Sequence, residues 1–525
     1  MSLFDKLQRI KQARGEASSG VKTDNPFRDK LDKFDAAVAG LESKSLDLRW
    51  RMFHGEDTSA ELQELGMANA RLVAESGYID VVESAVANAE GPDKRELEIR
   101  NRAIMLNKVR SHPEVSELMY IAHGTQNSFM PEIDGTPLSM GDIKGIQTSS
   151  PDQLLRAKAY YTRMQAHEKL GKIKMALVTA LNTYTPELTG QPTYSHLVLD
   201  TQDTTTAVLY SHLVGYEKGS RNVLEKVYAG VRESFGIKNI PPEDRDFLVH
   251  QYIGGLADEI LPRDKLLPAL KRTLELMGFG KIHGEKFIES IDKPPFRISL
   301  VSGEQYAPEE CAMRAAPGVD DYRVFINTDL EGSDMDIMRT LLLESGRAVH
   351  FYALNKLETR NTFKWDADCV RHAVAMLFGS VTSDEKWLRE IAGLRDDEAK
   401  YLASAYMLKT VLMKREIAAE ALFELQLYHG ENPVHAYHGV MERFEGTKLD
   451  PSAGLMWAWH PYTAINPCGN LSYSLGLLIH DVFSESVLSR FGTFLDPRVA
   501  EYMVDNFFSG MEIPWQDRIK KLSGG

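Results

Sequence analysis

Apolar residues recur at three- and four-residue spacing along most of the first half of the chain. Residues 27–53, FRDKLDKFDAAVAGLESKSLDLRWRMF, and residues 59–90 are two examples, and each carries its charged residues on the opposite face. This period is typical of amphipathic α-helices. The pattern therefore predicts a mainly helical lobe over residues 29–295. Residues 1–28, which include the polar patch GEASSG, are predicted to be a flexible or frayed tail.

The hydrophobic period changes between Phe296 and Asp329. FRISLV and YRVFINTD alternate apolar and polar residues, and CAMRAAPG between them is typical of a strand that runs into a turn. Alternation with period two indicates β-strands, so we expect a small antiparallel sheet. A helical pattern follows it, with Ser333 or Asp334 as the N-cap. We expect a second lobe over residues 296–525, with a single domain as the alternative because the pattern shows no clean boundary.

A polar stretch, HGTQNSFMPEIDGTPLSMGDIKGIQTSSPDQ, interrupts the helical pattern over residues 123–153. It is rich in turn-forming residues, so it predicts either a short hairpin or a connection between helical lobes. The next helix is expected to begin with Ser150 as its N-cap and Pro151 at its first position.

Composition and charge exclude several classes of function. The chain has 61 Lys and Arg residues against 75 Asp and Glu residues, a net charge of −14. Nucleic acid and anionic membranes attract basic surfaces, so neither is an expected partner. The chain shows no signal-like segment and no long charge-free run, and we therefore expect a cytoplasmic location. Cys311, Cys369 and Cys468 are too sparse for a disulfide framework or a CxxC metal site.

Residues 339–354, RTLLLESGRAVHFYAL, carry the strongest chemical signal. Zinc hydrolases of the HExxH type place two His four residues apart on one helix face, with a Glu beside the first as general base. A third ligand comes from a later helix. Here the five residues are LESGR, in which Leu343 has no donor atom and Arg347 stays cationic. Only Glu344 keeps its place, and we expect no metal or other cofactor.

The segment TLLLESGRAVH resembles TLFHEFGHALH of the oligoendopeptidase F and thimet oligopeptidase family, which is related to angiotensin-converting enzyme. The resemblance runs from about Arg297 to the C-terminus. It implies a mainly α, peptidase-like helical fold with a deep central cleft and the small sheet beside the active-site helix. VRHAVAMLFGSV resembles the family's second metal helix, whose Glu ligand falls at Arg371 (371 − 347 = 24) or His372 (372 − 347 = 25). Neither residue is a carboxylate.

Two later segments also resemble this family. HPYTAINPCGNLSYSLGLL resembles its substrate-clamping segment, which implies ligand contacts by His460, Tyr462 and Tyr473. PWQDRIKKLSGG resembles its closing helix, with Trp515 pointing inward.

The resemblance and the lost ligands together predict a pseudopeptidase that binds a peptide or protein segment in its cleft. Arg347 and Arg371 are expected to bind a carboxylate of that ligand, while Glu344 is vestigial. A simpler interpretation pairs Arg347 with Glu344, because the two are three residues apart on a helix. Two other functions stay open: an enzyme that uses Glu344 as acid or base in non-zinc chemistry, and a scaffold subunit. The sequence predicts no oligomeric state.

An altered metal set of His350, Glu344 and His372 is a weaker candidate. His350 follows Glu344 by six residues, which is about 600° around a helix, so the two side chains do not converge. We expect His350 and His372 to be packed or surface residues rather than ligands.

Three other residues are weak candidates as well. Cys468 lies eight residues after His460, but nothing in the sequence activates it, and a lone Cys is most often a small buried apolar residue. His435 and His438 have no third donor near them in the sequence, so a surface role is expected for both.

Overall fold

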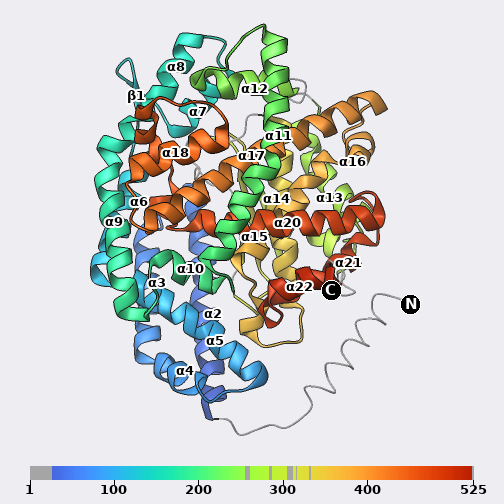
Figure 1. Ribbon diagram of the computed structural model, residues 1–525. Coiled ribbons are helices and arrows are strands. Elements are labelled where there is room, and N and C mark those ends of the chain that lie inside the picture. Colours follow the sequence, from blue (N-terminus) through green and yellow to red (C-terminus); the bar gives the residue numbers. More distant parts are fainter. Residues whose placement is uncertain are drawn as a thin grey trace. The chain divides into compact units, whose positions relative to one another are not determined.

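The computed structural model describes residues 26–254, 260–282, 286–303, 311–314, 316–329 and 333–522, and helices dominate this part of the chain (Figure 1). The expected mainly α fold class is confirmed. Residues 1–25 of the expected tail lie outside the described residues, whereas helix α2 already begins at Pro26. None of the described helices combines the length and apolar character needed to cross a membrane.

The chain divides into two compact units, each assembled from segments that are distant in the sequence. Unit 1 comprises Met1–Asn101, Asp258–Ala399 and Ile479–Gly525, and unit 2 comprises Arg102–Ala257 and Lys400–Leu478. Two consecutive lobes, 29–295 and 296–525, are expected from the sequence. These ranges do not coincide with the two units, and the lobe boundaries stay a prediction.

Unit 1 contains the sheet and the helix of chemical interest. Its helices are α2 (Pro26–Phe53), α3 (Ser59–Glu75), α4 (Tyr78–Val86), α13 (Leu266–Leu276), α14 (Asp334–Asn355), α15 (Asp368–Ser380), α16 (Glu385–Glu390), α21 (Val499–Asn506) and α22 (Trp515–Leu522). The chain passes between the units at four points, and three of them lie within helices: α5 (Gly91–Arg110), α17 (Asp396–Tyr428) and α20 (Gly469–Phe491).

Unit 2 is helical apart from one short hairpin. Its helices are α6 (Pro113–Asn127), α7 (Met140–Ser149), α8 (Gln153–Thr162), α9 (Gln165–Thr189), α10 (Tyr194–Thr201), α11 (Thr206–Phe235), α12 (Arg245–Gly254), α18 (Pro433–Glu445) and α19 (Tyr462–Ile465). Its hairpin is β1 (Glu132–Ile133) with β2 (Thr136–Pro137). Asp134 and Gly135 form the turn with φ of 53° and 79°, the left-handed conformation that two-residue hairpin loops require. The hairpin expected in this polar stretch is confirmed.

The start of the helix after this hairpin region differs from the prediction. Ser150 ends α7 as its C-cap, and α8 has Asp152 as its N-cap. The Asp152 carboxylate accepts hydrogen bonds from the backbone N–H groups of Leu154 and Leu155 at 2.9 and 3.2 Å. A carboxylate at this position satisfies two otherwise unpaired donors, which explains why the helix begins two residues later than expected.

The three-stranded sheet of unit 1 has the order β3-β5-β4, with β3 (Phe296–Val301), β4 (Cys311–Arg314) and β5 (Tyr322–Asn327). The small sheet beside the active-site helix is therefore confirmed. β4 pairs with β5 in the expected antiparallel sense, but β3 pairs with β5 in parallel. β4 lies between β3 and β5 in the sequence and runs antiparallel to β5, so the chain enters β5 in the direction that it had in β3.

Helix α14 is held by its N-cap and by close contact with α15. The Ser333 hydroxyl accepts a hydrogen bond from the backbone N–H of Asp336 at 3.1 Å, so Ser333 is the N-cap and Asp334 is not. A Cβ at Gly346 would lie 2.5 Å from Phe378 Cγ on α15, closer than van der Waals contact allows. Gly346 therefore permits an approach that any larger residue would obstruct.

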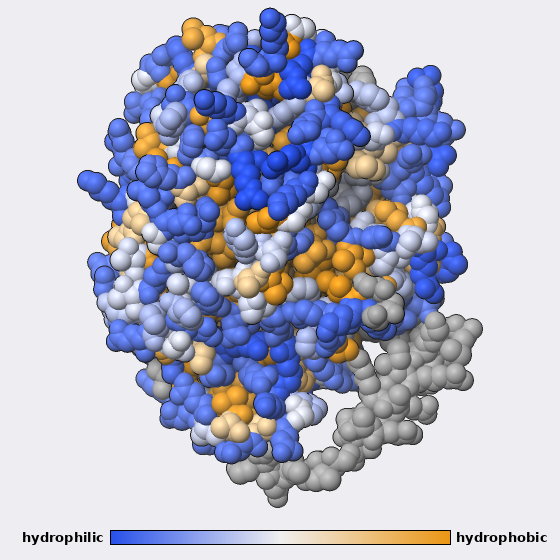
Figure 2. Space-filling view, in the orientation of Figure 1, coloured by the Kyte–Doolittle hydropathy of each residue, from blue (hydrophilic) through white to orange (hydrophobic). Residues whose placement is uncertain are grey.

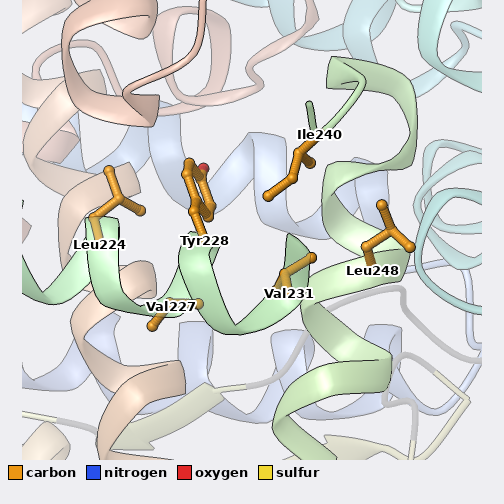
Figure 3. Close-up of a cluster of buried hydrophobic side chains, with 6 residues drawn as sticks. All are labelled: Leu224, Val227, Tyr228, Val231, Ile240 and Leu248. Atoms are coloured by element: carbon orange, nitrogen blue, oxygen red, sulfur yellow. The ribbon is translucent and has the colours of Figure 1, made fainter. Parts of the chain in front are cut away.

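Unit 2 is stabilised in part by a buried cluster on α11 and α12 (Figure 3). Figure 3 shows side chains from α11, from α12 and from the segment between them: Leu224, Val227, Tyr228, Val231, Ile240 and Leu248. Removing such side chains from water is the main favourable contribution to folding. On the face drawn in Figure 2, hydrophilic residues predominate, in keeping with the net charge of −14.

The contact between α14 and α15 generates a testable prediction. Gly346→Ala places a methyl group against Phe378, and we expect it to lower the free energy of unfolding by about 1–3 kcal/mol, the usual cost of overpacking. Gly40 lies inside α2 with nothing within 4 Å of an added Cβ. Gly40→Ala should therefore raise stability by about 0.5–1 kcal/mol through reduced backbone entropy. Urea unfolding of both variants measures the two effects, and equal responses would contradict the close contact.

Candidate functional site

The face of α14 that packs on α15 carries Leu343 and Arg347, the two residues compared above with metal ligands. A Cβ at Gly379 would lie 3.6 Å from Leu343 Cβ, and Arg347 Nη2 lies 3.4 Å from His372 Nδ1. Leu343 and Arg347 are therefore on the same face of α14, as the four-residue spacing requires. His372 is the residue of α15 that contacts Arg347 directly.

The residues at these positions do not fit a zinc ion. Leu343 has no donor atom, and the Arg347 guanidinium repels a cation. Among the residues that the structure describes, no group of three or more His, Cys, Asp and Glu side chains could hold a metal ion. The donor chemistry of this site suits an anion.

Glu344 connects α14 to the sheet. Its carboxylate is buried, and Oε2 accepts a hydrogen bond from the backbone N–H of Ala312 on β4 at 2.6 Å. Oε1 lies 3.6 Å from Arg347 Nε, so the structure contains the ion pair considered from the sequence. Burial raises the pKa of Glu344 above its usual value and outweighs the opposing effects of Arg347 and the Ala312 N–H. Both carboxylate oxygens thus have neighbours within the protein.

Arg371 brings a second guanidinium to α15. It pairs with Asp368 one turn earlier on the same helix. Burial, followed by repulsion from Arg347, lowers the pKa of Arg371 to about 10. The same causes, burial first and then the charges of Arg347 and Arg371, hold the pKa of His372 well below its usual value. Burial and both guanidiniums therefore favour the neutral form of His372.

Arg314 is a third guanidinium, and sequence reasoning missed it. It ends β4, and burial followed by repulsion from Arg371 lowers its pKa to about 9. The Arg314 guanidinium carbon lies 3.9 Å from the ring centroid of Trp365 and 4.7 Å from that of Phe351. The available signal in the sequence was an arginine within the short apolar strand CAMR.

His350 has a structural partner rather than a ligand role. Its Nε2 lies 3.3 Å from Asp366 Oδ2, and its ring packs against Phe508. Asp366 also accepts two hydrogen bonds from Arg518 of α22, at 2.8 and 2.9 Å. Burial opposes ionisation of Asp366, but Arg518 and His350 outweigh it and lower its pKa. This buried group attaches the closing helix, and the expected inward position of Trp515 is confirmed.

The three residues of the expected clamping segment belong to unit 2. His460 Nδ1 lies 2.6 Å from Glu420 Oε1, and Nε2 lies 2.9 Å from the Tyr437 hydroxyl, so both ring nitrogens have partners. The Tyr462 side chain is 44% exposed, whereas Tyr473 is half-buried. Their contact with a ligand, and the central cleft, stay predictions.

Lys174 forms hydrogen bonds with the backbone at the start of the segment HPYTAINPCGNLSYSLGLL. Its buried ammonium donates hydrogen bonds to the carbonyl oxygens of Ala458 and His460, both at 2.6 Å. Burial lowers the pKa of Lys174 to about 7. Sequence reasoning missed this residue because the contact joins positions almost three hundred residues apart.

The three weaker candidates, Cys468, His435 and His438, do not form a site together. Cys468 is buried, and burial raises the pKa of its thiol well above the usual value, so it is not a thiolate nucleophile. His435 lines a surface hollow of about 480 Å³ beside α17 and α18. His438 Nε2 instead lies 3.2 Å from the Leu449 carbonyl oxygen, so the two His residues do not share a site.

Comparison with known proteins identifies the fold. No family model matches the sequence, and no curated protein matches it. Among solved structures, PZ peptidase A with an inhibitor has a TM-score of 0.64 and 14% identity, with 96% of this chain and 95% of that chain covered. An M32 carboxypeptidase from Deinococcus radiodurans R1 has a TM-score of 0.61 and 12% identity, covering 95% and 96%. Oligoendopeptidase-F from Enterococcus faecium has a TM-score of 0.52 and 12% identity, covering 99% and 97%.

These similarities show that the chain has a metallopeptidase fold over nearly its whole length. The resemblance to oligoendopeptidase F expected from the sequence is thus confirmed for the fold. At identities this low the comparison is informative about architecture, and the chemistry of the site has to be argued from its own residues.

Rebuilding the metal set tests the arrangement of α14 and α15. The triple variant Leu343→His, Arg347→His, His372→Glu supplies two imidazoles and a carboxylate from two helices, the ligand set of several catalytic zinc sites. We expect it to bind one zinc ion, measured by competition with a chromophoric chelator, whereas the unmodified protein does not compete. The control triple variant carries Arg371→Glu with His372 intact and should bind zinc more weakly, because His372 contacts Arg347 directly. Zinc binding by the unmodified protein, or a reversed order of the two variants, would contradict this geometry.

Proposed function

We propose that this chain is a metallopeptidase-fold protein that binds a peptide or protein segment and does not hydrolyse it through zinc. The observation that carries this proposal is the Arg347 guanidinium, which occupies a metal-ligand position between Glu344 and His372, at 3.6 and 3.4 Å. A guanidinium attracts carboxylates and repels metal cations. The preferred ion at this site is therefore an anion.

The accessibility of two guanidiniums supports a ligand role. The side chains of Arg347 and Arg371 remain 24% and 29% exposed, so a solute can reach both. A peptide is the proposed ligand class because the chain shares its fold with peptidases, one of them solved with an inhibitor. Within unit 2 we propose, as a separate peptide contact, Tyr462, Tyr473 and His460, with His460 oriented by its two partners.

Binding is favoured over new chemistry because of the surroundings of Glu344. A general acid or base needs a free oxygen within reach of its substrate. Glu344 is only 4% exposed, and its two oxygens face the Ala312 N–H and the Arg347 guanidinium. Its proposed role is to orient Arg347 and attach α14 to β4.

A peptide mixture tests this proposal. We expect the protein to retain peptides with a free C-terminal carboxylate and to release them intact, as measured by mass spectrometry of bound and unbound fractions. Arg347→Ala should weaken binding about tenfold or more, because a charge-assisted hydrogen bond contributes about 1.5–3 kcal/mol. Arg347→Lys keeps the charge and should lose less.

The matched control is Arg272→Ala, which removes an exposed guanidinium of unit 1 paired with Glu275. This variant should bind peptides as the unmodified protein does. Retention of no peptide at all, or cleavage that zinc chelation abolishes, would refute the proposed function.

A further inference from the structure

Arg314 is half-buried and has no ion pair with an acidic side chain among the described residues. Its Nη1 donates a hydrogen bond to the Lys364 carbonyl oxygen at 3.2 Å. Its Nε and Nη2 are buried and have no hydrogen-bond partner in the described part of the chain. A buried donor without a partner is costly, so unpaired guanidinium groups of this kind require a reason.

The neighbouring guanidiniums show the same feature. The Nε atoms of Arg347 and Arg371 are also buried and make no hydrogen bond to the described residues. Arg371 repels Arg314, and Arg347 repels Arg371, which together with burial lowers the pKa values of Arg314 and Arg371. The contacts agree with this: Arg314 lies over the ring of Phe351, one turn after Arg347 on α14, and Arg347 lies beside His372, the neighbour of Arg371 on α15.

The described carboxylates near these three arginines already have ion-pair partners within the protein. Glu344 pairs with Arg347, and Asp368 pairs with Arg371. Asp366 accepts two of the hydrogen bonds that Arg518 donates. Among the described residues, three guanidiniums and the two carboxylates that pair with them leave one excess positive charge (3 − 2 = 1). A single bound carboxylate would neutralise it, whereas a dianionic phosphate would over-compensate.

We propose that Arg314, together with Arg347 and Arg371, forms an oxyanion-binding site that takes one carboxylate group. The Arg314 guanidinium carbon lies 3.9 Å from the Trp365 ring centroid and 4.7 Å from the Phe351 ring centroid, and these two contacts restrict the orientation of its N–H groups. A planar fork in a fixed orientation is suited to a planar carboxylate.

This inference rests on the proposed function for the source of the group, the terminal carboxylate of a peptide. The inference adds Arg314, which is not among the residues compared with metal ligands. Arg314 lies on the strand beside α14 and is the guanidinium in the cluster that has no carboxylate of its own in the described residues.

The Trp365 ring provides a local signal for the test. N-acetylglycine is the carboxylate probe, and N-acetylglycinamide is its neutral control. We expect a saturable change in tryptophan fluorescence with the acid and none with the amide. The chain has six tryptophans, so the change should also disappear in Trp365→Phe.

Variants of Arg314 separate ligand binding from packing. Arg314→Met keeps an unbranched side chain between the two rings and should weaken N-acetylglycine binding at least tenfold. Arg314→Lys should recover part of that loss, because it restores the charge without the planar fork. Arg272→Met, at an exposed position of the same unit, should leave binding unchanged.

Each outcome bears on one proposal or the other. An absent response to N-acetylglycine in the unmodified protein, or inorganic phosphate binding more tightly, overturns the carboxylate site. Peptides that bind equally with free and amidated C-termini, without any effect of Arg314→Met, overturn it while leaving the proposed function intact. N-acetylglycine binding through Arg314, with no peptide retained, supports the carboxylate site and refutes the proposed function.

Discussion

The close packing of α14 on α15 is the constraint on which the site depends. Gly346 has no side chain, and Phe378 fills the space where a Cβ would lie. This contact brings Leu343 beside Gly379 and Arg347 beside His372, so three positions from two helices converge. Any charged group placed there is partly removed from water and needs a partner of opposite sign. The backbone therefore defines a place for an ion, and the side chains decide its sign.

In this chain the side chains favour an anion. A zinc hydrolase at these positions presents neutral imidazoles and a carboxylate to a cation. Here Arg347 and Arg371 contribute positive charge, and β4 adds Arg314 from the sheet. Glu344 is the one acidic residue of the HExxH pattern that persists, and it now pairs with Arg347 and with the backbone of β4. These residues are the basis for proposing an anion site within a metallopeptidase fold.

The periodic parts of the fold were predictable from the sequence. Helical spacing, alternation in FRISLV and YRVFINTD, and the N-cap at Ser333 depend on residues a few positions apart. The common face of Leu343 and Arg347 follows in the same way from helix geometry. The capping residue of α8 was predicted two positions too early, because Ser150 and Asp152 are both good caps and local sequence does not rank them.

The parts that escaped prediction depend on contacts between distant residues. The parallel pairing of β3 with β5 is set by how the connecting chain returns to the sheet. Asp366 meets Arg518 across 152 positions, and this pair accounts for the buried His350. Arg314 joins the cluster only because β4 lies beside α14, which no spacing in the sequence encodes. Side-chain chemistry was readable from the sequence, but the neighbours of each side chain were not.

The central claim is that an anion replaces a cation at the α14–α15 contact. Anomalous diffraction tests it directly on crystals soaked either with 4-bromobenzoate or with zinc chloride, with data collected at the bromine and zinc absorption edges. The account predicts a 4-bromobenzoate molecule whose carboxylate lies among Arg314, Arg347 and Arg371, and no zinc peak beside Glu344. A zinc peak next to Glu344 and His372, with no 4-bromobenzoate at the arginines, would contradict it.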